Sequence, residues 1–294
     1  MKHRVQEALR QFGYEIHRVE NSPQRRSESK SWLPANEYDS VNPVWPLPCG
    51  GGLTANQIQE EFSKHAVWRY AYEFSGGLAF PRHSWPGQPP YDPRRPLQRF
   101  RHLMPYLLEA NKGSLQGKRV LDIACNSGFW AMQFALLGAE VVGFDARPDL
   151  IEEANLVKRV VGVKNVDFRV LDFWDMGPQS LGDKFDIVLS LGILYHLPKP
   201  IEALRLTKSM AREYILLDTE VSPSPDSVLQ LRWEEPAEIR SANRSGIVAI
   251  PSKGAIDLIL REIGMSESIR IPLRTKDMPY DYLGEWRASW LIRV

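Results

Sequence analysis

The chain has 294 residues with a formal net charge of +1, and 43% of its residues are hydrophobic. This apolar content suffices for a large core, while the near-neutral charge leaves no strong electrostatic footprint for nucleic acid. Two cysteines cannot build a disulfide framework, and no apolar run reaches the length of a membrane span or forms an N-terminal signal region. We therefore expect a cytoplasmic protein that crosses no membrane.

The N-terminal part of the chain predicts a mainly helical extension that forms a lid or a substrate platform. Apolar residues at helical spacing predict an amphipathic helix over 1–20, which packs on the body of the protein or on the partner in a homodimer. A second helix is predicted over 54–72, with Thr54 and Gln57 forming a capping box. Residues 75–97 are rich in glycine and proline and should be irregular.

Further along the chain, strand and helix signals alternate. Strands are predicted at the start of 120–128 and over 141–146, 166–174, 185–194 and 214–221. Helices are predicted over 97–110, 129–138, 148–162, 200–211 and 252–263. Residues 221–236 read as a loop-like insertion, and 269–273 and 286–294 as two closing strands. This alternation predicts an α/β fold with a parallel sheet covered by helices on both faces.

The most informative segment is VLDIACNSG at 120–128, which is followed by VVGFDA at 141–146. It places Asp145 at the end of the second strand, where a carboxylate accepts hydrogen bonds from both hydroxyls of a ribose. Where a dinucleotide fingerprint has three glycines, the loop carries Ala124, Asn126 and Gly128. A pyrophosphate cradle is therefore disfavoured, and S-adenosylmethionine (SAM) is the expected cofactor, with Asp172 near its adenine. An ordinary βα unit without a cofactor is the alternative.

Tyr195 and His196 follow the fourth predicted strand, in the segment LGILYHLPKP at 191–200. In a parallel sheet this position faces the crevice at the carboxyl ends of the strands. His196 is the candidate catalytic base, and Tyr195 is placed to donate a hydrogen bond to the acceptor or the cofactor. The alternatives are a histidine that caps the next helix and a tyrosine that packs against the cofactor loop.

Two groups of residues are candidates for binding the acceptor. Aromatic residues at alternate positions would form a lid attracted to a sulfonium, or else pack in the core: Trp68, Tyr70, Tyr72 and Phe74. Mixed charges at or beyond the fifth strand would suit a zwitterion such as an amino acid: Asp218, Glu220, Arg232 and Trp233. No cluster of histidines, cysteines or carboxylates has metal-ligand spacing, so no metal is expected.

Three pieces of sequence point to a known family: RFRHLMPYL at 99–107, LQGKRVLDIACNSGFW at 115–130 and LGILYHLPKP at 191–200. With them, the chain from about 92 to 200 resembles the tRNA wobble-uridine carboxymethyltransferase-like branch of the class I SAM-dependent methyltransferases. The resemblance implies a Rossmann-like sheet of seven mostly parallel strands, whose final pair turns back antiparallel. We expect an extension over 1–115 and a SAM-binding catalytic methyltransferase domain over 116–294.

The resemblance also implies which residues hold the cofactor. The loop 122–128 would bind the methionine end of SAM, Asp145 the ribose, and Asp172 with Phe173 the adenine, while Tyr195 faces the transferring group. Arg99 falls where the branch places a lysine, and carboxy-SAM is the alternative cofactor. The full set of expected cofactor contacts is Asp122, Ala124, Cys125, Asn126, Gly128, Asp145, Ala146, Arg147, Asp172, Phe173, Leu191 and Arg99.

The expected activity is transfer of a methyl group from SAM to a small polar metabolite, for example S-methylation of methionine. Such a displacement needs alignment of the reactants and exclusion of water, and it needs a base only where the nucleophile starts protonated. A tRNA wobble-uridine enzyme is the first alternative, although a wide tRNA surface would carry more positive charge. A non-catalytic SAM-binding module is the second alternative.

Overall fold

The computed structural model describes residues 41–294 except 66, 82–91 and 236–245. The helix predicted over 1–20 lies outside the described residues. Across the described part of the chain, no helix combines the length and the apolar character of a membrane span.

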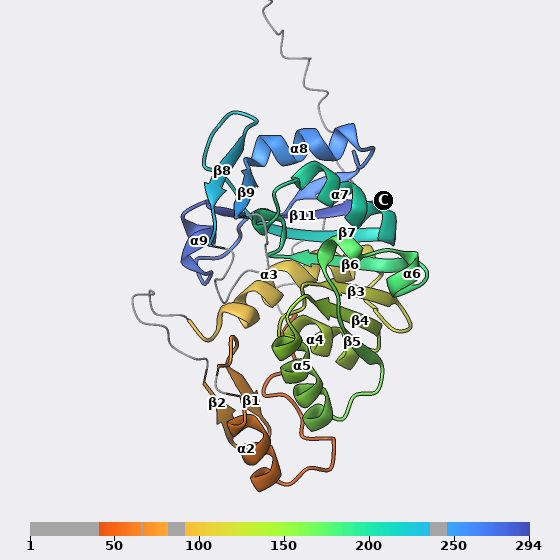
Figure 1. Ribbon diagram of the computed structural model, residues 1–294, viewed down its shortest axis with the longest axis vertical. Coiled ribbons are helices and arrows are strands. Elements are labelled where there is room, and N and C mark those ends of the chain that lie inside the picture. Colours follow the sequence, from red (N-terminus) through yellow and green to blue (C-terminus); the bar gives the residue numbers. More distant parts are fainter. Residues whose placement is uncertain (1–40, 66, 82–91, 236–245) are drawn as a thin grey trace, which may run out of the picture. The chain divides into compact units, whose positions relative to one another are not determined.

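Apolar segments build a seven-stranded sheet (Figure 1). Its strands are β3 (Arg119–Ile123), β4 (Glu140–Asp145), β5 (Val166–Val170), β6 (Phe185–Leu191), β7 (Ala211–Glu220), β10 (Ser268–Arg270) and β11 (Arg287–Arg293), in the spatial order β10-β11-β7-β6-β3-β4-β5. The predicted α/β fold with a mostly parallel sheet is confirmed. The prediction of a reversed final pair needs correction: β11 runs antiparallel to both β7 and β10, so β10 again runs in the direction of β7.

The chain changes its direction of travel across the sheet between β3 and β6. From β3 it adds β4 and β5 on one side, and it then crosses back to place β6 and β7 on the other side. At such a switch point the two connections part and leave a crevice at the carboxyl ends of the strands. The residues that follow β3, β4 and β6 therefore gather at one edge of the sheet.

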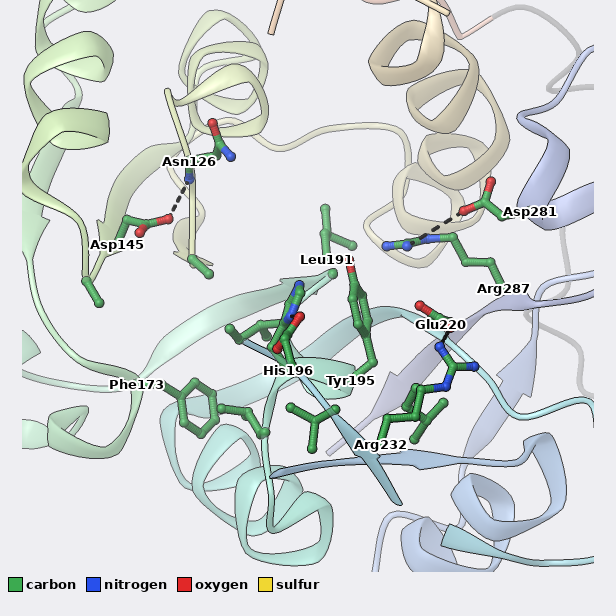
Figure 2. A pocket seen from close by; sticks show the side chains of 18 of the residues that line it. Asn126, Asp145, Phe173, Leu191, Tyr195, His196, Glu220, Arg232, Asp281 and Arg287 are labelled. Atoms are coloured by element: carbon green, nitrogen blue, oxygen red, sulfur yellow. Dashed lines mark hydrogen bonds and ion pairs between the residues drawn. The ribbon is translucent and has the colours of Figure 1, made fainter. Parts of the chain in front are cut away.

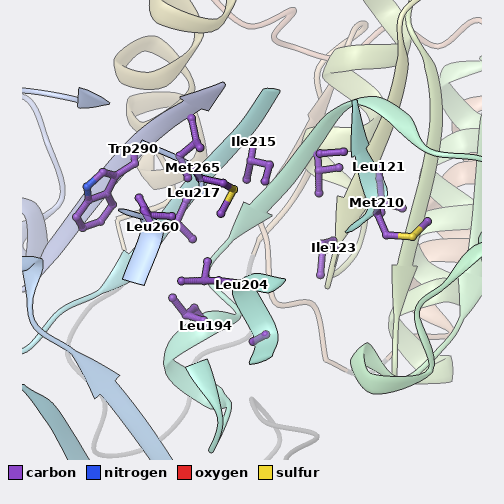
Figure 3. Close-up of a cluster of buried hydrophobic side chains, with 14 of the residues drawn as sticks. Leu121, Ile123, Leu194, Leu204, Met210, Ile215, Leu217, Leu260, Met265 and Trp290 are labelled. Atoms are coloured by element: carbon purple, nitrogen blue, oxygen red, sulfur yellow. The ribbon is translucent and has the colours of Figure 1, made fainter. Parts of the chain in front are cut away.

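Helices cover the sheet, and their bounds agree with the predictions apart from small shifts at the ends. They are α3 (Arg95–Ala110), α4 (Phe129–Leu136), α5 (Pro148–Val161), α7 (Pro200–Met210) and α8 (Lys253–Glu262), with shorter turns α6 (Pro178–Leu181), α9 (Tyr280–Leu283), η1 (Phe173–Asp175) and η2 (Leu194–His196). Alternate strand residues such as Leu121 and Ile123 meet α7 and α8 in a buried cluster (Figure 3). The largest side chain there, Trp290, also donates from Nε1 to Oδ1 of Asp257 at 2.8 Å, which ties β11 to α8.

The segment before α3 differs from the prediction in two places. Helix α2 (Ala55–Ser63) begins with the predicted capping box between Thr54 and Gln57, but it ends well before residue 72. The chain then forms an antiparallel hairpin of β1 (Tyr72–Phe74) and β2 (Leu78–Phe80), inside a stretch that was expected to continue the helix and then become irregular. The alternation of aromatic residues beyond α2 has the two-residue period of a strand, and this period prevails over helix propensity.

A second correction concerns residues 221–236, which were expected to form a loop. They contain β8 (Leu229–Trp233), which pairs antiparallel with β9 (Ile247–Pro251). The prolines and serines before β8 obscure its alternating pattern in the sequence. The pairing also depends on β9, which lies beyond the end of the predicted loop.

The described part of the predicted extension belongs to the same compact unit as the sheet. The N–H groups of Gly50 and Gly51 donate to the carbonyls of Val161 and Val160 at the end of α5, at 3.2 and 3.0 Å. A Cβ atom on Gly51 would lie only 1.6 Å from the Arg159 carbonyl oxygen, so only glycine allows this approach. The extension is thus fixed to the back of α5.

Candidate active site

A cavity of about 1070 Å³ lies at the carboxyl ends of the strands (Figure 2). It runs from the loop after β3 and the end of β4 to the β8–β9 hairpin and α9. Its volume reaches the upper end of the range for small-molecule sites, which leaves room for two ligands side by side. We call the part beside Asn126, Asp145 and Phe173 the cofactor half. The part beside Glu220, Arg232 and Trp286 is the acceptor half.

The loop after β3 has an unusual backbone. Ala124, Asn126 and Gly128 all adopt left-handed conformations, with φ of 53°, 54° and 85°. A side chain in this region costs about 1 kcal/mol, least for asparagine, so the loop takes the shape of a glycine-rich loop at the cost of some strain. Gly128 has a second constraint, because a Cβ atom there would meet the Phe168 ring at 2.8 Å.

Asp145 anchors this loop from the end of β4. Its Oδ2 accepts the N–H of Asn126 at 3.1 Å, and its two oxygens accept the Arg147 guanidinium at 2.8 and 3.0 Å. The carboxylate lies in the wall of the cofactor half, together with Ala146, Arg147, Asp172 and Phe173. The predicted ribose and adenine residues are thus brought together at one end of the cavity.

Three predicted cofactor residues lie behind the wall instead of lining it: Asp122, Cys125 and Gly128. Asp122 accepts the N–H of Ala131 at 3.1 Å and so ties β3 to the start of α4. Burial raises the pKa of Asp122 to about 7, although the bond from Ala131 opposes this shift. Burial likewise raises the pKa of the Cys125 thiol well above its ordinary range. These residues shape the loop, and their contact with a cofactor would be made by the backbone.

The aromatic residues predicted to cover the donor are placed elsewhere. Trp68, Tyr72 and Phe74 are buried in a cluster around Phe62, whose ring stacks on Trp68 with centroids 4.4 Å apart. These three side chains do not form the expected lid. Each of them packs in the core of the extension, which was the alternative. Tyr70, the fourth member of the predicted aromatic set, does line the cavity.

Tyr72 nevertheless acts on the cofactor loop from behind. Its hydroxyl lies 2.6 Å from the carbonyl oxygen and 3.0 Å from Oγ of Ser127, and both residues are fully buried. Because Ser127 lies within the strained loop, this contact restrains the loop from the side of the extension.

Asp218 was predicted to bind the acceptor, but its carboxylate is fully buried and outside the cavity lining. It accepts hydrogen bonds from Arg99 and Arg287 at 2.6 Å each, from the Tyr282 hydroxyl at 2.5 Å and from Ser289. Burial alone would raise the pKa of Asp218, but the two guanidinium groups outweigh it and hold the pKa well below its usual range. Asp218 therefore orients the two arginines. The prediction that it binds the acceptor directly is wrong, because its carboxylate does not reach the cavity.

Arg99 does line the cavity, as predicted, at the boundary between its halves. Its guanidinium lies between the buried carboxylate of Asp218 and the carbonyl oxygen of Leu191, which is 3.4 Å away. Its Nε donates to the hydroxyl of Tyr282 at 3.0 Å. Because α3, β6 and β7 all contribute to this contact, the side chain has a fixed position.

His196 and Tyr195 both line the cavity beyond the end of β6 (Figure 2). Nδ1 of His196 lies 2.6 Å from Oε1 of Glu234, and both side chains are largely buried. An ionised carboxylate can only accept, so the bonded state places a proton on Nδ1 and leaves Nε2 as the proton acceptor of a neutral ring. The Tyr195 ring lies beside the imidazole, with centroids 4.1 Å apart. Glu234 was not predicted, because its place near His196 depends on the β8–β9 hairpin.

The hairpin forms a wall of the acceptor half. Its inner face presents Gln230 and Arg232 from β8 with Val248 and Ile250 from β9. Arg232 pairs with Glu220 at 2.6 Å, so these two predicted acceptor residues lie together in the cavity wall (Figure 2). Trp233 also lines the cavity, as predicted, near its mouth. Further lining residues that the sequence did not indicate are Tyr280, Asp281, Trp286 and Arg287.

In the described ranges, no group of three or more histidine, cysteine and carboxylate residues is arranged to hold a metal ion. Several charged groups of the cavity wall pair with one another, such as Arg95 with Asp281 and Arg232 with Glu220.

Comparison with known proteins agrees with this geometry. Residues 114–250, just under half of the chain, match the family model described as a methyltransferase domain. Ubiquinone biosynthesis O-methyltransferases from Bordetella parapertussis and Xanthomonas euvesicatoria pv. vesicatoria are 31% and 34% identical over 118 and 122 residues. These alignments cover 40% and 41% of this chain, and the chain spans about half the length of these relatives, 48% and 49%.

Among solved structures, the N-terminal domain of EvdMO1 is similar over most of the fold. The form crystallised in the presence of SAH and D-fucose has a TM-score of 0.66 at 22% identity, covering 83% of this chain and 99% of that one. The form with SAH bound has a TM-score of 0.63 at 21% identity, covering 83% and 97%. These matches do not single out the wobble-uridine branch. They show the Rossmann-like methyltransferase fold, and residues 114–250 are similar to a methyltransferase domain.

Proposed function

We propose that this protein transfers a methyl group from SAM to a hydroxyl group of a small polar molecule, with His196 as the general base. The observation that carries this proposal is the 2.6 Å contact between Nδ1 of His196 and Glu234 in the wall of the cavity. A carboxylate that holds the imidazole in one tautomer is what a base needs in order to accept a proton at its other nitrogen.

The cofactor half fits SAM. Asp145 already accepts two donors from the Arg147 guanidinium, one on each oxygen. A ribose diol donates two hydrogens to a carboxylate in the same manner, so it would take the place of that side chain. Phe173 and Leu171 supply apolar surface for an adenine, and Asp172 lies beside them in the wall.

The left-handed loop around Asn126 and the Arg99 guanidinium supply groups for the methionine end of SAM. Arg99 keeps its charge because the neighbouring Asp218 carboxylate offsets the burial that would otherwise lower its pKa.

SAM would supply a methyl group on a positively charged sulfur, which departs as a neutral thioether. His196 accepts the proton of the acceptor hydroxyl at Nε2 while the acceptor oxygen forms its bond to the methyl carbon. Glu234 stabilises the imidazolium that results, since its carboxylate already accepts from Nδ1. Tyr195 limits the rotation of the imidazole by packing on its face. Exclusion of water and alignment of the reactants lower the activation barrier further, and alignment contributes about 7–11 kcal/mol in well-oriented systems.

The presence of this base argues against methionine as the acceptor. A thioether sulfur carries no proton, so S-methylation would leave the His196–Glu234 pair without a role. Asp218, one of the residues expected to hold a zwitterion, is moreover buried away from the cavity. An oxygen acceptor also agrees with the O-methyltransferases among the relatives.

The proposal is tested by a methyl-transfer screen with radiolabelled SAM. The purified protein would be offered pooled hydroxylated small molecules, pooled amino acids including methionine, and bulk tRNA. Label in the hydroxylated pool, lost in His196→Gln and retained in His65→Gln, is expected, since His65 lies outside the cavity lining. Label only in amino acids or tRNA would overturn the proposal, and SAM binding without transfer to any pool would favour a non-catalytic module.

The expected cytoplasmic location and homodimer stay predictions. A dimer would be checked by sedimentation of the full chain.

A further inference from the structure

The acceptor half presents three large aromatic side chains that line the cavity and are at least half exposed to solvent. Trp286, Tyr280 and Trp233 are 50%, 63% and 69% exposed, and all three line the cavity. A tryptophan ring left half-exposed beside a cavity is a surface that a ligand can cover, because the exposed apolar area favours contact.

Trp286 is held rigidly in this position. Its backbone N–H donates to the backbone carbonyl of Asp281 at 2.9 Å, and its backbone carbonyl accepts the N–H of Val221 at 2.7 Å. The Tyr280 ring meets it edge-on, with centroids 6.3 Å apart. The ring is therefore mounted on backbone that is fixed on both sides, and a ligand that stacks on it would not have to order a loop.

Three arginines of the acceptor half are already paired with carboxylates. Arg95 forms a bidentate pair with Asp281 at 2.6 and 2.7 Å, and Arg232 pairs with Glu220 at 2.6 Å. Arg287 pairs with the buried Asp218 at 2.6 Å. A charged acceptor would therefore meet guanidinium and carboxylate groups whose charges are compensated, and it would gain little from them.

These pairs still offer hydrogen bonds. A carboxylate has several acceptor sites and a guanidinium has five N–H donors, so the Glu220–Arg232 pair presents an acceptor beside a donor. A plain aromatic acceptor would cover this pair without replacing its water, which costs free energy. An acceptor with neighbouring hydroxyl groups satisfies both members at once.

We propose that the acceptor half binds a neutral, polyhydroxylated ring with the chemistry of a sugar. One C–H face of the ring packs on Trp286, and neighbouring hydroxyls bond to the Glu220–Arg232 pair. Glu220 lies directly opposite Arg287 across the β7–β11 pairing, next to Val221, whose N–H holds the Trp286 carbonyl. The Trp286 ring and the Glu220–Arg232 pair are thus parts of one surface. Methylation of one of the hydroxyls rests on the function proposed above, but the binding itself does not.

Calorimetric titration of the full chain tests binding separately from catalysis. The probes are methyl glycosides of hexoses and 6-deoxyhexoses, the matching uronic acids and amino sugars, and a catechol, each with and without saturating S-adenosylhomocysteine. We expect binding of at least one neutral glycoside, with its uronic acid and amino sugar binding more weakly. Trp286→Ala and Glu220→Gln should each raise the Kd of that glycoside about tenfold, while Trp286→Phe restores much of the affinity.

The matched control is Leu283→Ala, which removes an exposed apolar side chain of α9 outside the cavity lining. It should leave the Kd unchanged. Tighter binding of the catechol or of a charged sugar than of every neutral glycoside would overturn this inference and leave methyl transfer to a hydroxyl intact. Glycoside binding without methyl transfer would support the inference and contradict the proposed function.

Discussion

The two halves of the cavity are built in different ways. The cofactor half is assembled from strand ends that follow one another closely in the sequence, and its key contact joins Asn126 to Asp145. The acceptor half brings together α3, the end of β7, the β8–β9 hairpin and the turn before β11, as the contact between Arg95 and Asp281 illustrates. A compact local motif suits a ligand that stays the same. A wall made of distant segments can accept substitutions that change which ligand binds, without disturbing the sheet.

The halves also differ in how their charges are arranged. In the cofactor half, Asp145 bonds to a neighbouring side chain that a ligand can displace. In the acceptor half, guanidinium and carboxylate groups pair across different elements and so hold the wall together. Changes in the first half should therefore alter SAM affinity, and changes in the second should alter turnover and acceptor binding.

The largest effect is expected at His196. Replacing it with alanine removes the proton acceptor and should lower kcat by about 10²–10⁴-fold, the usual contribution of a general base. SAM affinity, measured by calorimetry, should remain that of the wild type. Near wild-type turnover in single-turnover assays would show that the His196–Glu234 pair is only structural.

Asp145→Ala should act on the other half. Loss of charge-assisted hydrogen bonds to the ribose is expected to weaken SAM binding about 100-fold. Asp167→Ala, which removes an exposed carboxylate paired with Arg169 on β5, is the control and should bind SAM normally. An unchanged SAM affinity in Asp145→Ala would contradict the assignment of the cofactor half.

Tyr72→Phe tests whether the extension restrains the cofactor loop. It removes the hydroxyl bonded to Ser127 but keeps the ring in its aromatic cluster, so the free energy of unfolding should fall by about 1–3 kcal/mol. SAM affinity should fall with it, because the loop loses a restraint. Urea unfolding and calorimetry measure the two effects, and a loss of stability with unchanged SAM affinity would limit Tyr72 to a packing role.

The smallest effect, outside both halves, concerns Glu153 on α5. Burial raises its pKa to about 8 from the ordinary value of 4.5, and Arg69 only partly opposes this shift. Since the native state then binds more protons than the unfolded state between these values, stability should fall as the pH rises from about 4.5 to about 8. Glu153→Gln should remove this loss and gain about 1–2 kcal/mol at pH 9, with little gain at pH 5. Equal stability of both proteins at pH 9, in urea titrations, would refute the shift.

What could be predicted from the sequence follows the same division. The parallel sheet, the positions of its helices and the place of Asp145 at the end of β4 were accessible, because each depends on a local pattern of strand, loop and helix. Glu234 was not, because it reaches His196 through a hairpin whose first strand follows a proline-rich and serine-rich stretch and whose second strand lies beyond the predicted loop. For Trp68, Tyr72 and Phe74 the sequence left a lid and core packing open, because alternation indicates a shared face but does not say whether that face meets a ligand or the core.

The ion cluster around Asp218 has a consequence for how the protein could be divided. A fragment limited to the matched residues 114–250 would keep the buried carboxylate but lose Arg99 from one side and Arg287 from the other. Stripping a buried charge of its partners costs about 3–5 kcal/mol, and β7 would become an open edge. The segments before and after residues 114–250 thus each supply an arginine to the same carboxylate, Asp218. The fragment 114–250 should therefore fail to fold, although it contains every residue of the loop after β3.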